Sequence, residues 1–340
     1  MTGRALYFTG DRGVEVRERA IPEPDDGEVR VRVERSGVSP GTERLVYRGE
    51  VPADVAVDEE FDAFSGRFDY PLRYGYAAVG RVTATGRGVD SAWRGRRVFG
   101  FNPHESHFCA PVEDLLAVPD ECSTVGATFL PNVETAVNFA QDGTPRLGER
   151  AAVFGQGVVG LLTTAVLSSF PLDGLVAVDG HASRRERSLA LGADAAFDPE
   201  SGDAGERIRA RLGDGEADGA DLTYELSGCP DALDSAIAAT GYDGRVVVGS
   251  WYGTKRTELD LGGRFHRSRV SVESSQVSTI DPRLRGRWTK ARRLAAAWDR
   301  LRTIEPERFV THEFDIADAP DAYELLDERP EEALGVVFEY

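Results

Sequence analysis

The sequence predicts an α/β protein that combines a β-rich domain with a doubly wound parallel sheet, and three observations support this fold class. Short alternating runs bounded by Gly, Pro and Asp fill residues 1–120, as half-buried strands do. From about Pro119, apolar helical stretches alternate with short apolar strands, the order that builds parallel sheets with right-handed crossovers. A glycine-rich turn follows the first of these strands. We place the β-rich domain at 1–121 and 290–340 and the parallel-sheet domain at 122–289.

The individual elements follow this division. In the β-rich region the clearest strands are 28–34 and 78–85, whereas 50–69 is acidic and aperiodic and is expected to be a loop. A helical stretch is expected at 125–139. The strands of the parallel sheet are expected at 151–154, 175–178, 222–225, 245–249 and 270–274. The tail predicts helices at 291–302 and 322–326 and a closing strand at 335–339.

The strand at 151–154 runs into Gly155, Gly157 and Gly160, spaced G-x-G-x-x-G. The first glycine permits a tight turn, the second lets the backbone approach a pyrophosphate, and the third lets the next helix pack closely. The anion then sits at the N-terminus of that helix. Asp179 ends the next strand, nineteen residues after Gly160, where a carboxylate can accept hydrogen bonds from a ribose diol. This order of strand, turn, helix, strand and acid predicts a dinucleotide site.

Asp179 favours NAD over NADP. Its charge attracts a free 2′-hydroxyl and repels a 2′-phosphate. Arg184 and Arg185 could instead serve a 2′-phosphate, so NADP remains an alternative.

The composition narrows the class of partners. The net charge is −18, from 58 acidic and 40 basic residues, and the only lysines are Lys255 and Lys290. Acid-rich, lysine-poor surfaces resemble those of halophilic proteins, where carboxylates keep the surface hydrated. The alternative, an ordinary acidic cytoplasmic protein, explains the negative charge but not the scarcity of lysine. The charge disfavours nucleic acid as a partner.

We also expect a cytoplasmic protein without a membrane partner. The apolar stretches are shorter than the ~20 residues of a membrane span, and the N-terminal segment MTGRALYFTGDRG has no apolar signal region. Cys109, Cys122 and Cys229 form no C-x-x-C pair, so neither a disulfide framework nor a structural zinc lobe is expected.

Further motifs carry a family resemblance that covers nearly the whole chain. They are SGVSPGTE at 36–43, YGYAAVGRV at 74–82, GRRVFG at 95–100, LGAD at 191–194, YELSG at 224–228 and DGRVVVGS at 243–250. With the glycine turn, they resemble the medium-chain dehydrogenase/reductase (zinc-type alcohol dehydrogenase-like) superfamily. The motif S-G-x-S-x-G-T-E is similar to a branch with bacteriochlorophyllide dehydrogenase-like proteins. The resemblance implies a GroES-like substrate domain, a Rossmann domain, an active site in the cleft between them and a homodimer.

The resemblance also implies further cofactor contacts. Arg184 stands where NAD-using relatives often carry a base. The other expected nucleotide contacts are Val158, Ser227, Gly249 and Ser275. The loop at Ser275 is implied to lie near the nicotinamide amide and the dimer edge, with a plain polar loop as the alternative.

Zinc-dependent members of the superfamily bind their metal with a Cys after the first strands, a His in a G-H-E motif and a later Cys or acid. The matching positions here look like Ser39, Tyr76 and the region around Pro131 and Asn132. A hydroxyl or a phenol is not a normal zinc ligand, so we expect no catalytic zinc. Residues 104–109 (HESHFC) hold four possible ligands, but a strand would point the two histidines to opposite faces. We therefore expect a strand or loop with solvated side chains there rather than a metal site.

Without zinc, hydrogen-bond donors or a general acid must polarise the substrate oxygen while a hydride moves. The resemblance to zinc-free quinone and enoyl reductases implies five catalytic candidates, namely Thr42, Glu43, Tyr47, Tyr76 and His104. Packing is the alternative role for Tyr76, and backbone bonding is the alternative role for Glu43.

We expect an NAD-preferring, zinc-independent oxidoreductase that acts on a small or medium organic substrate: a carbonyl compound, an alcohol or an enone. The alternatives are a zinc alcohol or polyol dehydrogenase with atypical ligands, and a catalytically inactive NAD(H)-binding sensor or structural protein. An enzyme is favoured, although fold alone does not establish function.

Overall fold

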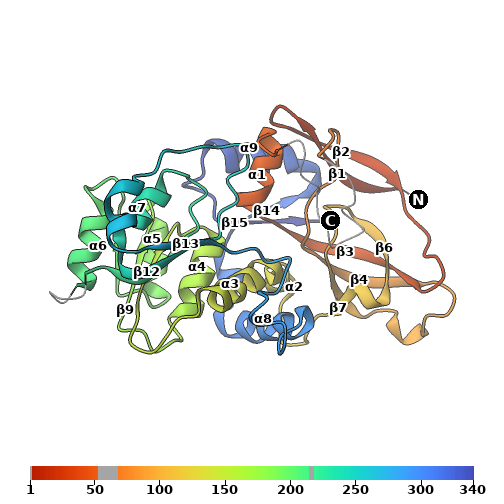
Figure 1. Cartoon of the computed structure of the whole chain (residues 1–340). Coiled ribbons are helices and arrows are strands. Elements are labelled where there is room, and N and C mark those ends of the chain that lie inside the picture. The colour runs from red at the N-terminus through yellow and green to blue at the C-terminus, as the bar shows by residue number, and fades with distance from the viewer. Residues whose placement is uncertain (1, 53–67, 214–217) are drawn as a thin grey trace. The chain divides into compact units, whose positions relative to one another are not determined.

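The computed structural model describes residues 2–52, 68–213 and 218–340, and its chain divides into two compact units (Figure 1). One unit comprises Met1–Pro131 and Leu301–Tyr340, and the other comprises Asn132–Arg300. Most of the loop expected at 50–69, namely 53–67, lies outside the described residues. None of the described helices combines the length and hydrophobicity that a bilayer crossing requires.

The first unit is β-rich, as the sequence predicts. Its main sheet has the strand order β14 (Val310–Asp315), β15 (Gly335–Glu339), β3 (Glu28–Val38), β4 (Ala78–Thr85), β5 (Arg97–Gly100) and β7 (Leu115–Ala117), with β6 (His107–Pro111) also paired to β3. A separate hairpin is formed by β1 (Thr2–Gly10) and β2 (Gly13–Ala20). The helices are α1 (Pro40–Arg48), α2 (Thr124–Ala127) and α9 (Ala319–Glu328). The expected strand 78–85 is confirmed to the residue, and the one at 28–34 continues to residue 38.

Strand β3 carries an irregularity that matters for the site. Val29, Val31 and Val33 are buried in strict alternation, as the apolar pattern predicts. The register with β4 then shifts between Val33 and Arg35, so that one extra residue reverses the side to which the strand points. As a result Ser36 turns inward and is fully buried.

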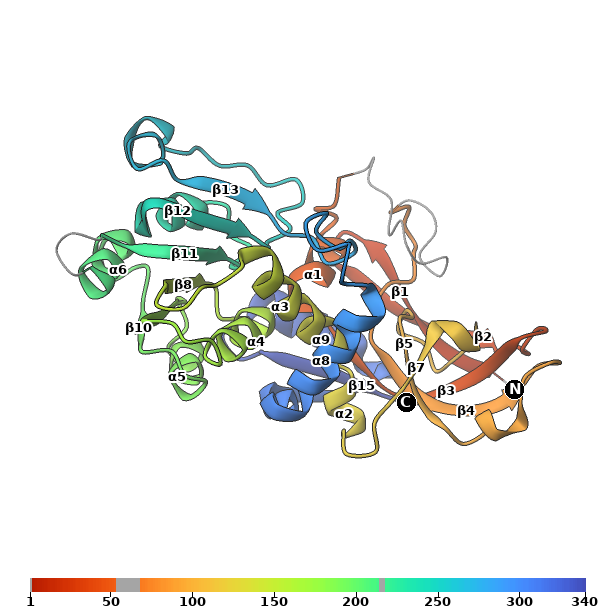
Figure 2. The same cartoon turned by 60° about the horizontal axis from the view of Figure 1, so that its bottom comes forward.

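The second unit is a doubly wound parallel sheet, and it confirms the predicted fold class. Its strand order is β10 (Ala195–Phe197), β9 (Gly174–Val178), β8 (Arg150–Phe154), β11 (Ala220–Glu225), β12 (Thr240–Val248) and β13 (Ser271–Ser274), with every neighbouring pair parallel. The helices of this part of the chain are α3 (Leu130–Gly143), α4 (Val158–Leu167), α5 (Ala182–Ala190), α6 (Ala204–Leu212), α7 (Ala232–Ala239) and α8 (Lys290–Ile304). Figure 2 shows β11, β12 and β13 side by side. All five strands expected between 151 and 274 are present, with ends that shift by up to five residues.

Candidate functional site

The glycine turn after β8 has the geometry that its spacing predicts. Gly155 has a φ of +86°, and a Cβ on it would lie 2.5 Å from the Cα of Ser227. A Cβ on Gly160 would lie 1.9 Å from the carbonyl oxygen of Gly155, so only glycine lets α4 pack this close to the turn. A Cβ on Gly157 would meet no described atom within 4 Å. The space over Gly157 is therefore open, as the approach of a pyrophosphate requires.

Helix α4 presents its N-terminus at this open space. It begins at Val158 with Gly157 as its N-cap, and no described side chain caps its first turn. The first N–H groups of the helix have no partner within it and, with the helix dipole, they attract an anion. The turn and the helix start therefore fit a dinucleotide pyrophosphate.

Asp179 follows β9 and closes the glycine turn. Its Oδ2 accepts the N–H of Gln156 at 2.7 Å, and its Oδ1 accepts the N–H of His181 at 2.8 Å. The Nη1 of Arg184 lies 4.0 Å from the Asp179 carboxylate, while Arg185 donates to the carbonyl of Asp179 at 2.7 Å. The acid and Arg184 are thus neighbours, and the carboxylate fixes the backbone that would face the cofactor.

Glu225, at the end of β11, is a fully buried acid that sequence reasoning did not single out. Its Oε1 accepts the N–H of Ser227 at 2.8 Å and also the Ser227 hydroxyl, and its Oε2 accepts the hydroxyl of Tyr252. Burial raises the pKa of Tyr252, and the charge of Glu225 adds to the shift. An acid that ends an apolar strand, as Asp179 does, was the signal available in the sequence.

Gly249 and Ser275 also lie beyond the carboxyl ends of parallel strands, the edge where doubly wound sheets bind ligands. The N–H of Gly249 donates to the carbonyl of Glu225 at 3.0 Å, and a Cβ on Gly249 would lie 2.2 Å from the ring of Phe139. The Ser275 hydroxyl donates to Asp142 and accepts the amide of Asn138 at 2.9 Å. Ser275 is therefore tied to α3.

In the β-rich unit, three hydroxyl groups meet at the start of α1. Ser39 is the N-cap of that helix and Thr42 lies in its first turn, while Tyr76 comes from the segment before β4. The phenol of Tyr76 hydrogen-bonds with the side chains of Ser39 and Thr42. The pKa of Tyr76 is raised to about 12. Burial is the largest cause, and the charge of Glu43 also raises the pKa, whereas the hydrogen bond with Ser39 lowers it. The phenol therefore stays protonated at neutral pH and can donate a hydrogen bond.

Glu43 and His104 are fully buried next to this group of hydroxyls. Glu43 Oε1 accepts the N–H of Ser39 at 2.7 Å. Its Oε2 bonds with His104 Nε2 at 3.0 Å and accepts the hydroxyl of Tyr323. Tyr47 stacks on Tyr323 with ring centroids 5.6 Å apart. The structure thus brings all five catalytic candidates to one region of this unit.

The expectation of solvated side chains at 104–109 is wrong for His104 and Glu105, which are both buried. The backbone of His104 pairs with Leu6 and Tyr74, which draws the ring into the core. Glu105 is only 4% exposed, and it accepts hydrogen bonds from Arg19, Arg73 and Asn102. The strand β6 begins only at residue 107.

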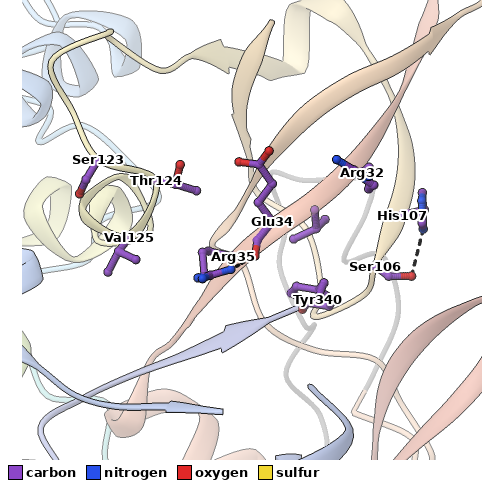
Figure 3. Close-up of a pocket in the computed structure, with 10 residues that line it drawn as sticks. Arg32, Glu34, Arg35, Ser106, His107, Ser123, Thr124, Val125 and Tyr340 are labelled. Atoms are coloured by element: carbon purple, nitrogen blue, oxygen red, sulfur yellow. Dashed lines mark hydrogen bonds between the residues drawn. The ribbon is translucent and has the colours of Figure 1, made fainter. Parts of the chain in front are cut away.

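Ser36 and Tyr340 complete the buried chain of polar groups. Ser36 Oγ lies 2.7 Å from His104 Nδ1 and 2.7 Å from the Tyr340 hydroxyl. Sequence reasoning missed Ser36, Tyr323 and Tyr340. Tyr340 also lines a cavity of about 490 Å³, beside Glu34, Arg35 and Thr124 (Figure 3). The buried chain therefore runs from the wall of this cavity to the start of α1.

The residues at the expected zinc positions do not fit zinc. Ser39 and Tyr76 bond with one another as neutral hydroxyls, and the raised pKa of Tyr76 opposes the formation of a phenolate ligand. Both ring nitrogens of His104 already have partners. Within 2–52, 68–213 and 218–340, no group of three or more His, Cys, Asp and Glu side chains could hold a metal ion. Zinc prefers thiolate, imidazole and carboxylate donors.

The chain is similar in sequence to known dehydrogenases. A family model described as zinc-binding dehydrogenase matches residues 158–297. The chain is 25% identical to the D-guloside 3-dehydrogenase of Escherichia coli (strain K12) over 345 residues, 96% of each protein. It is 23% identical to the (R,R)-butanediol dehydrogenase of Bacillus subtilis (strain 168) over 304 residues, 82% of this chain and 84% of the relative.

The fold is shared with solved structures. One is described as a short chain alcohol dehydrogenase from Escherichia coli CFT073 complexed with NADH. It superposes with a TM-score of 0.79 at 21% identity and covers 100% of this chain and 99% of its own. The β-rich unit and the parallel sheet therefore form a known two-part α/β architecture.

Proposed function

We propose that this chain is a member of the medium-chain zinc-type alcohol dehydrogenase superfamily and an NAD(H)-dependent alcohol or polyol dehydrogenase that works without catalytic zinc. One observation carries the zinc-free reading. The phenol of Tyr76 hydrogen-bonds with Ser39 and Thr42 at the place where zinc-dependent relatives are expected to hold their ligands. A protonated phenol and two hydroxyls form a cluster of hydrogen-bond donors there.

The chemistry follows from these donors. A bound nicotinamide supplies the hydride acceptor or donor. Tyr76 donates its hydrogen bond to the substrate oxygen, on which negative charge develops during reduction of a carbonyl group, and Ser39 and Thr42 orient the phenol. Because the pKa of Tyr76 is about 12, its proton can pass to a more basic alkoxide, so that hydride and proton together give the alcohol. Oxidation is the reverse, with the phenolate as base.

The substrate we propose is a secondary alcohol, or the matching ketone, on a molecule with several hydroxyl groups. The names of the curated relatives support this class: they include a guloside dehydrogenase, a butanediol dehydrogenase, a xylulose reductase and a sorbitol dehydrogenase. NAD is the proposed cofactor because the negative charge of Asp179 stands at the end of β9, beside the glycine turn.

The test is an assay of purified protein with NADH or NADPH against ketoses and hydroxyketones, and with the oxidised cofactors against polyols and glycosides. Metal content is measured on the same sample. We expect turnover that a chelator does not reduce, and zinc well below one ion per chain. We expect Tyr76→Phe to lower kcat about 100-fold, within the usual range for a lost general acid.

Tyr242→Phe is the matched control, because Tyr242 is 70% exposed and belongs to the parallel-sheet unit. One zinc per chain together with loss of activity on chelation would establish the atypical zinc enzyme instead. Tight NADH binding with no turnover on any substrate would establish the sensor or structural protein.

A further inference from the structure

We propose that His104 is a positioning residue that clamps the two segments carrying the hydroxyl cluster, the start of α1 and the 74–76 segment, into one catalytic arrangement. This inference rests on the proposed function, because it gives the cluster a catalytic task. Four contacts of the imidazole and its backbone carry it.

The first two contacts hold the 74–76 segment. The backbone N–H of His104 donates to the carbonyl of Tyr74 at 3.1 Å. The ring itself lies against Gly75, which has a φ of +111°, and a Cβ there would lie 2.5 Å from ring Cδ2 and 2.6 Å from Nε2. Only glycine allows this approach. The backbone next to Tyr76 is thus packed directly on the imidazole.

The third contact holds the start of α1. His104 Nε2 bonds with Glu43 Oε2 at 3.0 Å, and Glu43 Oε1 in turn accepts the N–H of Ser39 at 2.7 Å. The carboxylate fixes the N-cap residue whose side chain bonds Tyr76. One ring therefore reaches both partners of the Ser39–Tyr76 hydrogen bond, one through a carboxylate and the other through the adjacent backbone.

The fourth contact sets the tautomer. A carboxylate oxygen accepts hydrogen bonds, so Nε2 is the donor to Glu43; in the tautomer with its proton on Nε2, Nδ1 accepts from Ser36. Ser36 then accepts from the Tyr340 hydroxyl, so that His104 and Ser36 each donate one hydrogen bond and accept another. Phe338 packs edge-on against the ring, with centroids 5.2 Å apart.

His104 meets the description of a positioning residue rather than a catalytic one. It is fully buried, and both ring nitrogens are engaged with protein atoms. It therefore acts through Glu43 and through the backbone next to Tyr76. Displacing a catalytic group by about 1 Å can cost about 100-fold in rate, which sets the size of effect to expect.

The experiment compares His104→Leu with His104→Gln, alone and combined with Tyr76→Phe. Leucine removes the donor to Glu43, whereas the glutamine amide can replace it. We expect His104→Leu to lower kcat about 30-fold, with the dissociation constant for NADH unchanged within about twofold, and His104→Gln to recover at least about threefold of the loss. In the Tyr76→Phe background, His104→Leu should cost less than about twofold, because both changes remove the same effect.

Equal losses for leucine and glutamine, or additive losses with Tyr76→Phe, would overturn the role of His104. Should His104→Leu fail to fold, Ser36→Ala carries the test: the free Nδ1 lets the ring change tautomer, and kcat should fall at least about threefold at an unchanged NADH affinity. Unchanged kcat in Ser36→Ala would then reject the proposal.

If Tyr76→Phe alone keeps full activity, the proposed function fails and this inference fails with it. Loss in Tyr76→Phe with full activity in His104→Leu rejects only the inference.

Discussion

Arg293 donates from its Nε to Glu134 Oε1 at 3.0 Å, and the two side chains are 0% and 2% exposed. The same guanidinium donates to Asn138 Oδ1 at 2.5 Å and to the backbone carbonyls of Val277 and Thr279. It therefore ties α3 to the segment that follows β13. Burial raises the pKa of Glu134, even though Lys290 and Arg293 both oppose the shift. Glu134 thus has an internal cationic partner in Arg293.

Breaking this buried pair from one side should be costly. We expect Arg293→Met to lower the free energy of unfolding by about 3–5 kcal/mol, because the buried Glu134 carboxylate loses its nearer cationic partner and keeps only Lys290, 3.7 Å away. The double variant Arg293→Met, Glu134→Leu should lose less than the single one, since no uncompensated charge remains. Urea denaturation measures both. Arg329→Met is the control: Arg329 pairs with Glu332 at the surface, and its loss should cost under about 1 kcal/mol. A single-variant loss below that of the control would contradict the prediction.

The glycine turn offers a pair of substitutions with opposite signatures. Gly157→Ala should leave the melting temperature nearly unchanged, because the added Cβ meets no described atom within 4 Å, but it should weaken NADH binding at least about tenfold by obstructing the pyrophosphate. Gly160→Ala should instead destabilise the fold, because its Cβ would lie 1.9 Å from the carbonyl oxygen of Gly155. Calorimetry and NADH fluorescence titration separate the two effects. Normal NADH affinity in Gly157→Ala would mean that the pyrophosphate binds elsewhere.

Asp179→Asn should shift cofactor preference toward NADPH. The substitution removes the charge that repels a 2′-phosphate while keeping one acceptor oxygen for the turn. We expect the ratio of kcat/KM for NADPH to that for NADH to rise at least about tenfold, an effect of about 1.4 kcal/mol. Asp243→Asn is the charge-matched control, because Asp243 pairs with Arg269 at the surface. Equal use of both cofactors by the unaltered protein would argue against the preference itself.

The pKa of Tyr76 sets the expected pH dependence. Carbonyl reduction needs the protonated phenol, which persists up to about pH 12, so its rate constant should not fall between pH 7 and 10 on account of Tyr76. Alcohol oxidation needs the phenolate, so kcat should rise with pH throughout pH 8–11 without reaching a plateau. Steady-state kinetics in both directions give the two profiles. In Tyr76→Phe the alkaline rise should disappear; a plateau near neutral pH in the unaltered protein would point to a different base.

The glycine turn could be predicted because its information is local. Strand, glycines, helix and Asp179 lie within thirty residues, and each answers a steric or electrostatic need of the turn itself. The β3 and β4 strands were equally accessible through their alternation.

The buried polar chain was not accessible in this way. By the alternation of β3, Ser36 falls on the same face as the exposed Arg32, and only the shift after Val33 turns it inward. Tyr323 and Tyr340 reach Glu43 and Ser36 across 280 and 304 residues of chain, a pairing that tertiary packing alone creates. Residues 104–109 were expected at the surface because the sequence shows their polar side chains but not the tertiary packing that buries the first of them.

The choice of arginine over lysine has a consequence for solutions of this protein. A chain with two lysines has few amines to titrate near pH 10, and guanidinium groups keep their charge well beyond that. Burial raises the pKa of the Cys109 thiol to about 11, and it also raises the pKa of the Tyr70 phenol. From neutral to mildly alkaline pH the molecule therefore behaves as a polyelectrolyte of nearly fixed charge. Its electrophoretic mobility and its hold on counterions should change little over a range in which lysine-rich proteins shed their positive charge.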